Sequence, residues 1–122
     1  MTVADSALKS KAERLLALHV PGRPLVLPNA WDAGTAKLIA LEGFPVIATT
    51  SAGIAFSYGY PDGEAIPRAT MMAAVARIAA AVSVPVTADV EAGYGSAPED
   101  VAATVRDLLA IGVVGGNFED GG

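Results

Sequence analysis

The chain has 122 residues, which suits one domain and is short for two. It contains no cysteine, which excludes disulfides and thiolate metal sites, and its net charge of -5 argues against nucleic-acid binding. No apolar run approaches the ~18 residues of a membrane span, and the N-terminus lacks the pattern of a signal peptide. We therefore expect neither nucleic acid nor membrane as a partner, and cytoplasmic residence by default.

Helix-like and strand-like segments alternate along the chain. Helices are expected at about residues 6–19, 32–42, 67–82 and 97–111, with Asp32 as an N-cap and Ser96 and Glu99 as the capping box of the last one. Apolar strands are expected at residues 25–27, 45–50, 84–89 and 113–118, and a long polar loop at residues 51–66. The strand runs do not alternate with polar residues, which is typical of parallel strands buried on both faces. The fold class is thus α/β, with an N-terminal helix and then four parallel strands joined by helices.

Two carboxylates follow the third of these strands. Asp89 and Glu91 are two residues apart, so on a strand their side chains would point to the same face. Adjacent carboxylates repel unless a cation or a shared proton relieves them, and such oxygen pairs commonly hold Mg²⁺. The pattern therefore predicts a divalent metal site, with a solvated strand end as the alternative.

Polar residues also follow the other strands. In parallel α/β folds functional residues gather at the carboxyl ends of the strands. Here those ends carry residues 29–32, residues 49–53 and the acidic pair Glu119 and Asp120. Hydroxyl and backbone N–H groups beside a metal would suit the negative oxygens of an α-keto acid or an enolate. Local backbone capping at residues 49–51, a turn at Asp62 and a solvated Glu119 are the structural alternatives.

Five motifs resemble the isocitrate lyase/phosphoenolpyruvate mutase superfamily, in the order that this family has them. They are Asn29-Ala30-Trp31-Asp32-Ala33-Gly34, Thr50-Ser51-Ala52-Gly53, Gly59-Tyr60-Pro61-Asp62, Asp89-Val90-Glu91-Ala92-Gly93-Tyr94-Gly95 and Asn117-Phe118-Glu119-Asp120. The resemblance implies a (β/α)₈ barrel of about 250 residues, of which residues 1–122 would form a single incomplete domain, the first half.

The resemblance also implies roles for particular residues. Asp89, Glu91 and Glu119 would hold Mg²⁺, partly through water, although the family often has Asp at the position of Glu91. Asp62 would be catalytic, on a loop beside the reacting centre. The substrate carboxylate would contact the turn formed by Thr50, Ser51, Ala52 and Gly53.

The implied activity is cleavage of a C–C bond in a 2-hydroxy or 2-oxo carboxylate through an enolate, similar to that of 2-methylisocitrate lyases. Phosphonopyruvate or phosphoenolpyruvate mutase chemistry and oxaloacetate decarboxylation are alternatives, because the residues that separate them lie in the other half of the barrel. The gating loop of the family, with its catalytic Lys, is not found here, so we expect this chain alone to be inactive. We expect a homo-oligomer, because four parallel strands leave two free edges and an uncovered apolar face. A non-catalytic half-barrel that self-associates is a further alternative. A small α/β binding module is disfavoured, because the chain has no fifth strand and no Lys at a late strand end.

Overall fold

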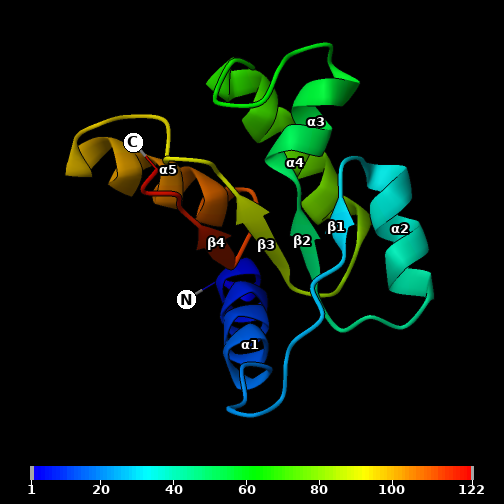
Figure 1. The fold of residues 1–122 in the computed structure, drawn as a ribbon. Helices are drawn as coiled ribbons and strands as arrows, with labels where there is room; N and C mark the ends of the chain where they lie inside the picture. The colour runs from blue at the N-terminus through cyan, green and yellow to red at the C-terminus, as the bar shows by residue number, and fades with distance from the viewer. Residues whose placement is uncertain (1, 122) are drawn as a thin grey trace.

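The computed structural model describes residues 2–121, which form an α/β unit (Figure 1). Its helices are Val3–Ala17 (α1), Ala33–Leu41 (α2), Ser51–Ser57 (α3), Arg68–Ala81 (α4) and Pro98–Ala110 (α5). Its strands are Asn29–Ala30 (β1), Ile47–Thr49 (β2), Val86–Asp89 (β3) and Gly115–Asn117 (β4). None of the helices within residues 2–121 combines the length and the apolar composition that a membrane-spanning helix needs.

The four strands form one parallel sheet in the order β1-β2-β3-β4. Ala48 of β2 lies opposite Asn29 on one side and Thr87 on the other, and Asp89 of β3 lies opposite Asn117 of β4. Because all strands run the same way, their carboxyl ends share one edge of the sheet, which we call the carboxyl edge. Sequential strand order and parallel pairing confirm the architecture expected from the apolar runs.

The core lies between the sheet and the helices that follow the strands. Ile47 of β2 and Val86 of β3 are buried together with Ile54 of α3 and with Met71 and Ile78 of α4. Helices α2 and α4 pack against each other, and Figure 1 shows them together beside the sheet. Burial of these large apolar side chains supplies the main driving force for this arrangement.

The first strand begins later than expected. The apolar run at residues 25–27 was predicted as a strand, but the ladder with β2 starts only at the carbonyl of Pro28, which accepts from Ala48 N at 3.0 Å. Val26 is 65% exposed, so its apolar side chain does not contribute to the core. Pro24 and Pro28 flank the run, and a proline has no N–H to donate to a ladder.

The expected loop at residues 51–66 is wrong in its first part, which forms helix α3. The Thr50 hydroxyl caps this helix by accepting from Gly53 N at 3.1 Å. Ile54 and Ala55 on the same short helix are buried in the core. Ser51 and Gly53 are weak helix formers, so local propensity favoured a loop, whereas capping and burial override it.

The cap of α2 lies where the sequence predicts it, whereas the cap of α5 lies one residue later than predicted. Asp32 caps α2 as expected, because its Oδ1 accepts from Thr35 N at 2.7 Å. The capping box of α5 is not formed by Ser96 and Glu99. Asp100 instead accepts from Ala97 N at 3.2 Å. Pro98 occupies the first helical position, which it prefers, and this sets the register of the cap one residue later.

The N-terminal helix α1 packs beside the start of β4. Leu15, the buried residue of α1, lies directly over Gly115. A Cβ atom built on Gly115 would lie 2.6 Å from Leu15 Cδ2 and 2.8 Å from Thr87 Oγ1. This close approach requires a residue without a side chain, so Gly115 lets α1 dock across the lower end of β3 and β4 (Figure 1).

Candidate functional site

Asp89 ends β3 and is held by residues that follow β2. Its Oδ2 accepts from Ser51 Oγ at 2.7 Å and from Ser51 N at 3.3 Å. Its backbone N–H donates to the buried Thr49 Oγ1 at 3.1 Å. Asp89 therefore has a fixed carboxylate that is only half-buried and lies at the carboxyl edge. Its Oδ2 accepts two bonds from Ser51, whereas Oδ1 accepts only from Glu91 N, at 3.1 Å, and keeps a lone pair for another partner.

Glu91 does not point to the same place as Asp89. Its φ of 53° breaks the extended geometry on which the two-residue alternation rests. Its side chain is buried and reaches the loop between α3 and α4, where Oε1 accepts from Gly63 N at 2.9 Å and Glu64 N at 2.8 Å. Its Oε2 accepts from the Tyr94 hydroxyl at 3.2 Å. Both carboxylate oxygens of Glu91 thus have protein donors.

Glu64, in the loop between α3 and α4, bonds in turn to the loop that contains Glu91. Its Oε1 accepts from Ala92 N and from Tyr94 N, each at 3.1 Å. Burial, and then the negative charge of Glu91, raise the pKa of the Tyr94 hydroxyl, so it stays protonated and can donate. Glu64 is not among the site residues expected from the sequence. Its position two residues after Asp62 gives no signal, because its partners lie 28 and 30 residues away.

Glu119 and Asp62 are the exposed members of the cluster of carboxylates at the carboxyl edge. Glu119 N donates to the Glu91 carbonyl at 2.6 Å, which places Glu119 next to the end of β3. The negative charge of Asp89 is the largest cause that raises the pKa of the Glu119 carboxyl, and the carboxylates of Asp62, Glu91 and Glu64 add to it. Every charge that shifts this pKa is negative, so the carboxyl edge carries a concentrated negative potential.

The four expected substrate residues form the start of α3. Thr50 uses its hydroxyl to cap the helix, and Ser51 uses its hydroxyl to hold Asp89. Ala52 and Gly53 lie in the first turn and are partly exposed. The structure thus places this turn beside Asp89, while contact with a substrate stays a prediction.

The predicted metal ligands fit Mg²⁺ by their chemistry. All are carboxylate oxygens, which hard divalent cations prefer, and their mutual repulsion is what a cation relieves. Residues 2–121 contain no group of three His, Cys, Asp or Glu side chains that is already arranged around a metal position. Among the three predicted ligands, Asp89 through Oδ1 and the exposed Glu119 have oxygens open to such an ion, and the charge of Asp89 raises the pKa of Glu119. Metal binding by Asp89, Glu91 and Glu119 stays a prediction.

A parallel sheet with carboxylates and hydroxyls at its carboxyl edge is the arrangement in which α/β enzymes commonly carry their active sites. Comparison with known proteins supports this class. The profile of the family described as phosphoenolpyruvate phosphomutase matches residues 15–122. The chain therefore belongs to the phosphoenolpyruvate phosphomutase family, within the isocitrate lyase/phosphoenolpyruvate mutase superfamily, as the motifs indicated.

Several similar proteins are named as enzymes. The chain is 38% identical over 110 residues to 2,3-dimethylmalate lyase of Eubacterium barkeri, which covers 89% of the chain and 38% of that protein. The crystal structure of a protein from Burkholderia cenocepacia J2315, described as a lyase/mutase, matches with 47% identity and a TM-score of 0.87, covering 94% of this chain and 41% of that one. Phosphonopyruvate hydrolase, solved with oxalate and Mg²⁺, matches with 29% identity and a TM-score of 0.84, covering 92% and 39%.

These matches confirm the fold class, four parallel strands and intervening helices as in the first part of family members. The chain spans about two fifths of the length of the relatives it matches. The named family members include lyases, a mutase and hydrolases, so superfamily lyase or mutase chemistry is the class of activity to which this chain is related.

Proposed function

We propose that this chain is part of a Mg²⁺-dependent enzyme that cleaves a C–C bond in a 2-hydroxy or 2-oxo carboxylate through an enolate. The observation that carries the proposal is the half-buried Asp89 carboxylate, fixed by Ser51 beside Glu119 at the carboxyl edge. Support comes from the name of the related 2,3-dimethylmalate lyase, whose substrate is a 2-hydroxy dicarboxylate, and from the oxalate and Mg²⁺ of the similar hydrolase structure.

Each group at the edge has a part in this proposal. Mg²⁺, when bound, would supply positive charge that stabilises negative substrate oxygens. Asp89 and Glu119 would hold it, and Ser51 keeps the Asp89 carboxylate in one orientation. The first turn of α3, from Thr50 to Gly53, would contact the substrate carboxylate. Asp62, at the exposed tip of its loop, would lie beside the reacting centre as the catalytic acid or base.

Ligand-linked stability tests this function without requiring turnover. We expect Mg²⁺ with oxalate, each at millimolar concentration, to raise the midpoint of thermal unfolding, because a ligand that binds only the folded state stabilises it. Asp89→Asn should abolish the rise, whereas Glu99→Gln, an exposed change in α5, should keep it. No rise in the wild-type chain would contradict a retained site. Mutase chemistry on a C–P bond and decarboxylation of oxaloacetate would give the same rise, and product analysis with the complete protein separates them.

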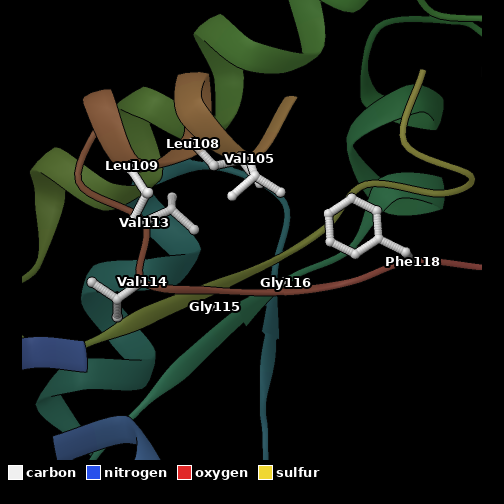
Figure 2. Close-up of a pocket in the computed structure, with 8 residues that line it drawn as sticks. All are labelled: Val105, Leu108, Leu109, Val113, Val114, Gly115, Gly116 and Phe118. Atoms are coloured by element: carbon white, nitrogen blue, oxygen red, sulfur yellow. The ribbon is translucent and has the colours of Figure 1, made fainter. Parts of the chain in front are cut away.

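A second candidate function is self-association, and a specific apolar surface favours it. Among residues 2–121, β1 and β4 each have only one strand neighbour. Figure 2 shows the groove beside β4, between that strand and α5, where Val105, Leu109 and Phe118 are each about 40% exposed. Because both edge strands are parallel, a twofold axis could set β4 of one copy beside β1 of another, giving a homo-oligomer.

Light scattering after size-exclusion chromatography tests this second candidate. We expect a dimer for the wild-type chain and a monomer for Leu109→Lys, which places a charge in the groove. Leu41→Lys is the control, because Leu41 is 81% exposed on α2 and away from the groove. A wild-type monomer at high protein concentration would rule the candidate out.

A further inference from the structure

Two loops at the carboxyl edge hold each other through a pair of glutamates. One loop follows α3 and includes residues 59–66; the other follows β3 and includes residues 90–97. Glu91 in the second loop accepts from two backbone N–H groups of the first, and Glu64 in the first loop accepts from two backbone N–H groups of the second. The four distances are between 2.8 and 3.1 Å, so each bond has good hydrogen-bond geometry.

The backbone at this crossing is in an uncommon conformation. Within residues 2–121, the non-glycine residues with positive φ are Glu64 at 62°, Glu91 at 53° and Tyr94 at 59°. All three take part in the bonds between the two loops. Left-handed backbone costs about 1 kcal/mol or more for a residue with a side chain, so it persists only where surrounding contacts compensate. The clustering of all three at one place indicates that the bonds between the loops supply that compensation.

Glu91 also forms a hydrogen bond with Asp89, with Glu119 and with Gly63, the residue next to Asp62. Its backbone N–H donates to Asp89 Oδ1 at 3.1 Å, and its carbonyl accepts from Glu119 N at 2.6 Å. Its carboxylate holds Gly63, the residue that follows Asp62. Its own oxygens are buried and directed to amide and hydroxyl donors, which satisfy the buried charge.

We propose that the Glu91 side chain is a positioning group for Asp62: with Glu64 it holds the Asp62 loop against the loop that follows β3, and we call these four bonds between the loops the brace. The contacts of Glu91 with Asp89 and Glu119 are made by its backbone, so they do not depend on the side chain. Its role toward the site rests on the proposed function, whereas the brace itself does not. The length of the side chain is essential to this role. An aspartate at position 91 would be one methylene shorter and would not reach the amides of Gly63 and Glu64, although it would still present a carboxylate at the strand end.

This difference in reach makes Glu91→Asp the decisive variant. We expect the amide protons of Gly63 and Glu64 to lose their downfield NMR shifts and to exchange with solvent at least about tenfold faster in both Glu91→Asp and Glu91→Gln, because charge-assisted bonds are lost. Binding of Mn²⁺ alone, as a probe for the divalent site, should weaken by no more than about threefold in either variant, and about tenfold or more in Asp89→Asn. Glu42→Gln, an exposed change at the end of α2, should alter neither measurement.

Glu64→Gln tests the two bonds that Glu64 accepts, and it replaces the Glu91 variants as the test if these do not fold. It should raise exchange at the amides of Ala92 and Tyr94, which donate to Glu64. Wild-type protection at Gly63 and Glu64 in Glu91→Asp would overturn the proposal. So would a tenfold loss of Mn²⁺ affinity in Glu91→Gln with unchanged exchange, since Glu91 would then be a ligand. If the wild-type chain binds no Mn²⁺, the proposed function fails, and the exchange rates alone decide for or against the brace.

Discussion

Ser51 and Asp89 are 38 residues apart in the sequence, yet the Ser51 hydroxyl donates to the Asp89 carboxylate at 2.7 Å. This bond joins the start of α3 to the end of β3, and the Ser51 N–H adds a longer bond to the same oxygen. A buried serine thus orients the acidic residue on which the proposed metal site depends.

Ser51→Ala should therefore lower stability and divalent-ion binding together. Loss of a hydroxyl bond to a charged acceptor costs about 1.5–3 kcal/mol, and the half-buried position of Asp89 places the effect toward the lower end. Urea unfolding measures the stability, and Mn²⁺ titration measures the binding. Ser83→Ala, at an exposed serine outside the site, is the control. Equal unfolding free energies for the two variants would contradict the importance of this bond.

Gly53→Ala and Gly34→Ala should have opposite effects, although both replace a glycine in a helix. A Cβ atom on Gly53 would lie 2.6 Å from Thr50 Cγ2 and 3.3 Å from Trp31 Cβ, so it would push on the residue that caps α3. On Gly34 the nearest atom would be Asp32 Oδ1, at an ordinary 3.6 Å. We expect Gly53→Ala to destabilise by about 1–3 kcal/mol, and Gly34→Ala to stabilise by up to about 1 kcal/mol through helix propensity.

Thermal and urea unfolding of these two variants give the comparison directly. Stabilisation of both variants would show that propensity alone decides at these positions, and destabilisation of both would contradict the expected gain at Gly34. A destabilised Gly53→Ala that regains stability when Thr50 is replaced by Ser would locate the clash at the Thr50 methyl group.

Thr104→Val should loosen the glycine-rich loop after β3. Thr104 is buried in α5, donates to the Gly93 carbonyl at 2.8 Å and accepts from Arg68 Nη2 at 3.3 Å. Valine has nearly the same shape but leaves that carbonyl without its donor, which costs about 1–3 kcal/mol. Thr70→Val, a half-buried position in α4, carries the same change in helix propensity and should cost less. Equal losses in urea unfolding would contradict a specific role for Thr104.

The cap of α2 should give the protein part of its sensitivity to acid. The hydrogen bond from Thr35 N lowers the pKa of Asp32 below its ordinary 3.8. A carboxyl with a lower pKa in the folded state contributes its full stability above about pH 4, and that contribution is lost as the pH falls through the folded-state pKa. Asp32→Asn keeps a capping side chain, so at pH 7 its stability should stay within about 1 kcal/mol of the wild type.

Unfolding curves between pH 2 and pH 7 test this pH dependence. Below about pH 4 the stability of Asp32→Asn should fall less steeply than that of the wild type, because the variant has no proton to gain at this position. Identical slopes in the two proteins would show that the cap does not contribute to acid sensitivity.

Much of the fold could be predicted because its signals are local. Apolar runs mark β2, β3 and β4, and Gly43, with a φ of 90°, ends the region of α2 as the sequence indicated. Helix α3 could not be recognised in this way. Its seven residues include weak helix formers, and it is stabilised by the Thr50 cap and by burial of Ile54 against other elements.

The sequence predicted which residues form the candidate site better than it predicted how their side chains are arranged. The expectation that residues 89 and 91 share one face assumed an extended backbone, and the φ of Glu91 departs from it. The partners of Glu91 lie 27 and 28 residues earlier, in a loop whose path no local pattern determines. Tertiary contacts of this length decide which carboxylates remain open, so the roles of Asp89 and Glu91 could not be separated from spacing alone.

The contact between Leu15 and Gly115 has a consequence for the order of folding. The two residues are 100 positions apart, and Leu15 can settle only after β3 and β4 have paired and brought Thr87 and Gly115 together. Helix α1 has its own capping box, from Thr2 and Asp5, and can form early without the sheet. Because contacts distant in sequence form slowly, we expect α1 to be helical before it docks, and its docking to report that the last strand is in place.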